Sequence, residues 1–250
     1  MKIRKNQVKE KLAAGKVACV AAGLTSSDDI DTFGPAGFDG IWLEGEHGGV
    51  GPADLGDLTR ACDIWGMTSI ARINRNDQGL IYRTFDRGAQ GVVVPHVNNA
   101  SEAQNFVDGA KFAPLGKRGL FTGRQGYGVG DYVKMANEET LLVALIEDIA
   151  AVRALDEILE VDPIDVFFVA PNDLAASMGH IGDLTHPEVR ETIKETLGRI
   201  QAAGRISGAL SSIDTAEQQI ADGVRFLLAS TNSWIAAGAT EFLKRASAGK

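Results

Sequence analysis

The chain has 250 residues, of which 44% are hydrophobic, and 33 acidic against 25 basic residues give it a net charge of −8. This length suits one (β/α)8 barrel or two smaller domains. The acidic balance without a basic block argues against nucleic acid and membranes as partners, and no apolar run reaches the roughly 18 residues of a membrane-spanning helix.

The amino terminus is basic from Met1 to Lys5, but it leads into a polar segment and not into the apolar core of a signal peptide. The two cysteines, Cys19 and Cys62, lie in apolar surroundings without a cysteine or histidine at metal-ligand spacing. Such residues are typical of buried, reduced thiols, so we expect a cytoplasmic protein without disulfides.

Short apolar runs alternate with helical patterns along the chain. Ser26 and the residues after it can cap a helix to about Pro35, and Pro52 starts an amphipathic helix to about Trp65. The run at 91–97 is β-branched, which is typical of a strand buried on both faces. The expected strands are residues 17–24, 38–43, 68–73, 91–97, 141–146, 166–170, 206–210 and 226–230. Further expected helices end at Arg87 or span residues 101–110, 186–203 and 232–245.

The segment 114–130 is long, irregular and carries six glycines, without the lysine and serine or threonine of a phosphate-binding loop. It is either a mobile connector or a lid or binding loop. Eight strands, each followed by a helix, without a linker between them, predict a single (β/α)8 TIM barrel domain over residues 1–250. A doubly wound sheet is the alternative, but no G-x-G-x-x-G follows the first strand.

Polar residues gather where the expected strands end. Glu44, Glu46 and His47 follow the second strand, among glycines, and Arg72 ends the third. Glu147 and Asp173 follow the fifth and sixth strands and complete the set. The carboxyl ends of parallel strands share one rim, so we expect these residues to converge there.

This combination has a chemical meaning. Two carboxylates suit a hard divalent cation, an arginine can stabilise an enolate oxygen, and a histidine can move a proton. The structural alternatives stay open: Glu147 could be a surface acid at a helix start, Asn172 or Asp173 could cap a helix, and Arg72 could pair with Asp77 or Asp86.

The chain resembles the HpcH/HpaI aldolases, which are metal-dependent class II pyruvate aldolases of 4-hydroxy-2-oxo acids. The resemblance covers about residues 15–245. The matching stretches are GFDGIWLEGEH, ARINRND, DRGAQGVVVPHVNNASEA, APLGKRG and PNDLAASMGHIGDLTHPEV.

The resemblance implies a (β/α)8 barrel in a homo-oligomer, a hexamer or trimer, with the last helix exchanged between subunits. It implies a divalent metal ion, Mg²⁺ or Mn²⁺ before Co²⁺ or Zn²⁺, held by Glu147 and Asp173. His47 matches the catalytic base, and Asp86 matches the acid that raises the basicity of this histidine.

Two further residues match substrate-binding positions of the family. Arg72 matches the group that stabilises the pyruvate enolate, and Asn172, next to Asp173, falls where the pyruvate carboxylate is bound. The resemblance thus implies a small 2-oxo acid and an aldehyde as ligands.

The chain departs from the family pattern around the substrate. Glu44 stands where aspartate is usual, Leu145 where glutamine is usual, Ala170 where glycine is usual and Ala175 where serine is usual. His96 replaces a methionine, and we expect it to be a satisfied core histidine rather than a polar group of the site.

These observations predict a metal-dependent lyase that breaks or forms the C3–C4 bond of a 4-hydroxy-2-oxo acid. No lysine follows a strand where a Schiff base would need it. An acyl-CoA ester lyase of the citrate lyase beta or malyl-CoA type is the alternative, with only Lys117, Arg118 and Arg124 as candidates for the CoA phosphates. A barrel that binds 2-oxo acids without turning them over is a third reading, supported only by Leu145 and Ala175.

Overall fold

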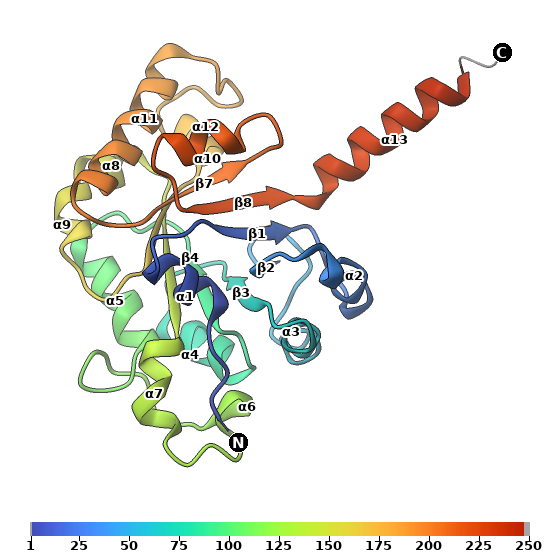
Figure 1. The fold of residues 1–250 in the computed structure, drawn as a ribbon. Helices are drawn as coiled ribbons and strands as arrows, with labels where there is room; N and C mark the ends of the chain where they lie inside the picture. Colours follow the sequence, from blue (N-terminus) through green and yellow to red (C-terminus); the bar gives the residue numbers. More distant parts are fainter. Residues whose placement is uncertain (1, 248–250) are drawn as a thin grey trace.

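A computed structural model describes residues 2–247 as a closed barrel of eight parallel strands, paired in chain order with β8 next to β1 (Figure 1). The predicted (β/α)8 barrel and its eight strands are confirmed. The strands are β1 Ala18–Ala22, β2 Gly40–Glu44, β3 Thr68–Arg72, β4 Gly91–Val94, β5 Leu141–Ile146, β6 Val166–Val169, β7 Ser207–Ser211 and β8 Phe226–Ser230.

Alternate side chains of each strand point into the barrel or toward the surrounding helices. Trp42, Phe168 and Phe226 belong to the interior cluster, where the ring of Phe168 lies 5.6 Å from that of Trp42 and 6.1 Å from that of Phe226. Val92 and Val94 pack outward against helices, whereas Val93 points inward. The barrel interior is therefore a packed core, and the space for chemistry lies above it at a rim.

Helices cover the outside of the barrel, as Figure 1 shows. Ser26 caps α2 through a capping box with Asp29, as the sequence predicts. The helices are α1 Gln7–Ala13, α2 Ser27–Phe33, the 3-10 helix η1 Gly34–Ala36, α3 Leu55–Ile64, α4 Gln78–Asp86, α5 Ala100–Ala110, α6 Gly123–Gly126, α7 Tyr132–Glu139, α8 Ile149–Arg153, α9 Leu155–Leu159, α10 Pro171–Ser177, α11 Pro187–Ala202, α12 Ala216–Ala221 and α13 Thr231–Ser247.

Helix α1, which is not among the helices expected from the sequence, closes the amino end of the barrel. Val8 and Leu12 pack into the interior cluster, and the Asn6 side chain donates to the carbonyls of Gln90 (3.1 Å) and Glu139 (3.0 Å). Because this end is sealed, the carboxyl rim is the face left for a ligand.

The last helix, α13, leaves the barrel and points away from it (Figure 1). The base of α13 is held against the barrel, where Trp234 stacks on Phe38 with ring centres 5.5 Å apart. Ile235, Phe242 and Leu243 are all at least 60% exposed. Within residues 2–247, none of the helices has the length and apolar character needed to cross a membrane.

Candidate active site

Strands β2 and β3 bring Glu44 opposite Arg72 in register at the carboxyl rim. Arg72 Nε lies 2.8 and 3.0 Å from the two carboxylate oxygens of Glu44, and its Nη1 lies 3.0 Å from Glu46 Oε2. The guanidinium also sits 5.8 Å from the centre of the Trp42 ring. Arg72 is therefore fixed by the two acids of the β2 end, and the predicted alternative pairing with Asp77 or Asp86 is wrong.

The turn after β2 is organised by the Glu44 carboxylate, which accepts the backbone N–H groups of Glu46 (2.9 Å) and His47 (3.0 Å). Burial favours a higher pKa for Glu44, but hydrogen bonds from Arg72 and His47 outweigh it, and the pKa lies below its usual value. A Cβ at Gly45 would lie 2.6 Å from the Arg72 carbonyl oxygen, so this position requires glycine.

The side chain of His47 projects from this turn and is 67% exposed, with Nε2 3.7 Å from Glu46 Oε2. Glu44, which stands where the resemblance leads us to expect aspartate, thus binds the backbone N–H of His47 and does not contact the His47 ring. His47 is left free to turn its ring toward a ligand.

Two predicted metal ligands meet on the other side of the rim. Glu147 is only 1% exposed and its Oε1 accepts the backbone N–H of His96 at 2.8 Å. Burial raises the pKa of Glu147, and repulsion from Asp173 and Glu46 adds to the rise, although His96 opposes it. The carboxylates of Glu147, Asp173 and Glu46 therefore repel one another at a partly buried site. Together they offer oxygen donors of the kind that bind a divalent cation.

The structural alternatives for these acids are wrong. Glu147 is buried, so it is not a surface acid. The N-cap of α10 is Ala170, which places Asn172 and Asp173 in the first turn and not at the cap.

A hollow of about 320 Å³ at the carboxyl rim brings most of the predicted residues together. His47, Arg72, Asn172 and Asp173 line it. Leu145, 1% exposed, lies in its floor, so the departure from the family's glutamine makes the floor apolar.

His96 is not the core histidine that we expect from the sequence. Its side chain is 57% exposed, and its Nδ1 lies 2.8 Å from Asp148 Oδ2 and 3.6 Å from Glu147 Oε1. Its φ of 52° is unusual for a residue with a side chain. A strained backbone that presents a polar ring beside a buried carboxylate is typical of a functional rim.

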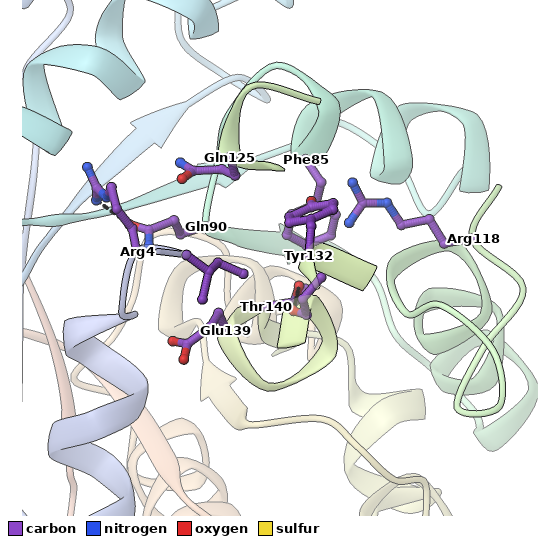
Figure 2. Close-up of a pocket in the computed structure, with 11 residues that line it drawn as sticks. Arg4, Phe85, Gln90, Arg118, Gln125, Tyr132, Glu139 and Thr140 are labelled. Atoms are coloured by element: carbon purple, nitrogen blue, oxygen red, sulfur yellow. Dashed lines mark hydrogen bonds between the residues drawn. The ribbon is translucent and has the colours of Figure 1, made fainter. Parts of the chain in front are cut away.

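Asp86 lies apart from His47 within one chain. It is the last residue of α4, which leads into the amino end of β4, so it lies at the end of the barrel opposite His47. Arg118 Nη2 donates to Asp86 Oδ1 at 2.8 Å, and the Arg118 guanidinium lies 5.0 Å from the Phe85 ring centre. Figure 2 shows Arg118 beside Phe85 at a small cavity of about 20 Å³. A contact between Asp86 and His47 therefore requires two copies of the chain.

The basic residues considered for CoA already have acidic partners. Lys117 pairs with Asp108 (2.5 Å), Arg124 pairs with Asp63, and Arg118 is buried against Asp86. They do not form a free basic surface near the hollow.

A second group of metal-type side chains was missed from the sequence. The ligand atoms of His180, His186 and Glu188 lie within 4.8 Å of one another at the start of α11. His186 Nδ1 accepts the Glu188 N–H at 3.3 Å, so one of its two ring nitrogens is engaged in capping the helix. The spacing of the two histidines in GHIGDLTHPE is the only signal in the sequence for this cluster.

The chain is similar in sequence and in fold to proteins of one known family. A sequence model of the HpcH/HpaI aldolase/citrate lyase family matches residues 22–238. A hydroxypyruvate/pyruvate aldolase of Roseovarius nubinhibens is 35% identical over 231 residues, 89% of each chain. A 2-keto-3-deoxy-L-rhamnonate aldolase of Klebsiella pneumoniae is 34% identical over 81% of this chain and 78% of its own. The crystal structure of an HpcH/HpaI aldolase/citrate lyase family protein from Burkholderia cenocepacia superposes with a TM-score of 0.91 at 25% identity, over 97% of this chain and all of that one.

Proposed function

Because the chain belongs to the HpcH/HpaI aldolase/citrate lyase family, we propose that it is a metal-dependent aldolase that cleaves or forms 4-hydroxy-2-oxo acids through a pyruvate enolate. The observation that carries this proposal is that His47, Arg72, Asn172 and Asp173 line one hollow, with the buried carboxylate of Glu147 next to Asp173. The products are pyruvate and an aldehyde.

The donor set fits a divalent cation such as Mg²⁺ or Mn²⁺. Glu147 and Asp173 would hold it, and their mutual repulsion gives the site an affinity for positive charge. When bound, the cation would polarise the keto and carboxylate oxygens of the oxo acid.

Other residues at the carboxyl rim would transfer the proton, stabilise the enolate and bind the carboxylate of the oxo acid. The His47 ring is exposed and lines the hollow, and an imidazole is the side chain that most often serves as a general base, which suits removal of the proton from the 4-hydroxyl group. Arg72 has five N–H donors, and Glu44 and Glu46 occupy only part of them, so N–H groups remain to stabilise the developing enolate oxygen. Asn172 lies in the first turn of α10, where backbone N–H groups can bind the pyruvate carboxylate.

We further propose a cytoplasmic homo-oligomer, a trimer or hexamer, in which α13 is exchanged between subunits. The exposed apolar side chains of α13 support this proposal, since a helix that leaves the barrel needs a partner for them. In such an assembly Asp86 of one copy would act on His47 of another.

The experiment that tests the aldolase is proton exchange of pyruvate in deuterated buffer, together with retro-aldol cleavage of a 4-hydroxy-2-oxo acid. We expect chelation of divalent cations, and separately Arg72→Ala, to lower both rates by at least about 100-fold, because each removes stabilisation of the enolate. Arg83→Ala, at an exposed position of α4, is the matched control. Full activity that survives both treatments refutes the mechanism.

A further inference from the structure

The carboxyl rim of the barrel carries very few permanent positive charges. In the segments that lead from the strand ends into the next helices, all within the described residues, Arg75 is the only lysine or arginine. Arg72, at the end of β3, is held by Glu44 and Glu46. Arg75 is exposed and, within residues 2–247, has neither an ion pair nor a side-chain hydrogen bond. It is therefore the uncompensated cation of this rim.

Arg75 lines a hollow of about 470 Å³ together with Asn74, Asn76, His96 and Ser101. This hollow is distinct from the one that holds His47 and Asp173. Its polar lining offers N–H and O–H donors around a free guanidinium, which is the chemistry that binds an anion.

The segment that carries Arg75 is fixed in place. The Asn76 side chain donates to the Glu102 carbonyl at 2.8 Å, and the Asn105 side chain donates to Asn76 at 2.9 and 3.1 Å. The Glu102 carboxylate also lines the hollow, but it accepts the backbone N–H of Asn98 at 2.7 Å. The one acid of the lining is thus engaged with the backbone, and Arg75 is held on a loop tied to α5.

The hollow adjoins the proposed site. His96, which lines it, has Nδ1 only 3.6 Å from the Glu147 carboxylate, and Arg75 follows Arg72 by three residues. A ligand whose oxo-acid end lies between Arg72 and Asp173 can therefore extend its other end past His96 toward Arg75.

We propose that Arg75 and this hollow bind an anionic group, a carboxylate or a phosphate, at the far end of the aldehyde half of the substrate. The inference rests on the proposed aldolase activity and narrows its substrate class to 4-hydroxy-2-oxo acids with a second, distal anion. Arg72 stabilises the enolate, whereas Arg75 selects the aldehyde.

The test is aldol addition of pyruvate to aldehydes matched in size and different in charge. Succinic semialdehyde is compared with butanal, and glyceraldehyde 3-phosphate with glyceraldehyde, for wild type, Arg75→Gln and Arg75→Lys. We expect Arg75→Gln to lower kcat/KM for one of the charged aldehydes by about 10- to 100-fold, as for loss of a charged hydrogen bond, and for its neutral counterpart by less than about 3-fold. Arg75→Lys keeps the charge and should recover part of the loss. The charged aldehyde that responds identifies the anion as carboxylate or phosphate.

Two controls separate the failure of this inference from failure of the aldolase. Arg83→Gln removes an equal charge at an exposed position of α4, outside the hollow, and should leave the ratio of charged to neutral aldehyde unchanged. Pyruvate proton exchange needs no aldehyde, so Arg75→Gln should leave it unchanged. Two results overturn the role of Arg75 without affecting the aldolase proposal, provided that wild-type proton exchange is normal. One is that Arg75→Gln lowers kcat/KM equally for charged and neutral aldehydes; the other is that Arg75→Gln and Arg83→Gln have the same effect. Absence of metal-dependent exchange in wild type overturns the aldolase and the inference with it.

Discussion

The side chain of Glu44 holds both Arg72 and the backbone of His47 in place. The substitution Glu44→Gln tests this role. The carboxylate accepts from Arg72, from the Trp42 Nε1 at 3.1 Å and from the amides of Glu46 and His47. A glutamine keeps one acceptor for the amides but turns an NH₂ group toward the guanidinium. Loss of a charge-assisted hydrogen bond costs about 1.5–3 kcal/mol. Because the Glu44 side chain is 25% exposed, we expect the lower half of this range, about 2 kcal/mol.

In a chain of this size about 2 kcal/mol corresponds to a fall in melting temperature of roughly 4–8 °C. Activity should fall further, by about 10- to 100-fold in kcat, since Arg72 loses its second anchor and the turn that carries His47 loosens. Thermal unfolding and pyruvate release from a 4-hydroxy-2-oxo acid measure the two effects. Glu217→Gln, at an exposed position of α12, is the matched control. A Glu44→Gln variant that melts earlier but keeps its kcat refutes the link between this carboxylate and the catalytic groups.

Two further predictions concern Lys111, which is buried near the amino end of the barrel, and the pair His47 and Asp86. Burial lowers the pKa of Lys111 from 10.5 to about 7. Between these two values the unfolded chain therefore binds more protons than the folded chain. The free energy of unfolding should rise with pH across this window, by at most about 1.4 kcal/mol per pH unit. Urea unfolding at pH 7, 8 and 9 should show this dependence on pH in wild type and in the control variant Lys134→Met, which changes an exposed lysine. The variant Lys111→Met should lose it. An unchanged dependence on pH in Lys111→Met contradicts the lowered pKa of Lys111. His47→Ala and Asp86→Asn should each be nearly inactive, and oligomers mixed from equal amounts should regain up to about a quarter of wild-type activity, because a site between copies can then combine an intact His47 with an intact Asp86. Mixed oligomers that stay inactive show that the two residues do not act across copies.

The sequence allowed the barrel and much of the rim to be predicted because both depend on local patterns. Apolar runs such as 141–146 and 226–230 need no partner to be recognised as strands. Since parallel strands end at one rim, the positions of Arg72 and Asp173 followed from the order of elements alone. Helix α1 was missed because only Val8 and Leu12 of its seven residues are buried, which gives too short an apolar pattern.

Contacts between distant residues could not be predicted in this way. His96 lies in an apolar stretch of the sequence, which favours a core position. Its positive φ and its contact with Asp148, which place the ring at the rim, are visible only in the structure. Asp86 matches a family position, yet its place at the amino end of β4 separates it from His47 of the same chain, and no sequence pattern indicates that a second copy is needed to bring the two together.

The charges of the rim also determine the order in which ligands can bind. Among the described residues the carboxylates of this rim outnumber the permanent cations, since the acids include Glu44, Glu46, Glu147, Asp148, Asp173 and Glu102, whereas the cations are Arg72 and Arg75. An oxo acid brings a further negative charge, which this field repels at short range. If the proposed divalent cation is held by Glu147 and Asp173, it would remove this repulsion at the place where the oxo acid would bind, whereas Arg75 lines a separate hollow. Metal binding should therefore precede binding of the oxo acid, and the distal anion of the aldehyde half should be recognised independently of the metal.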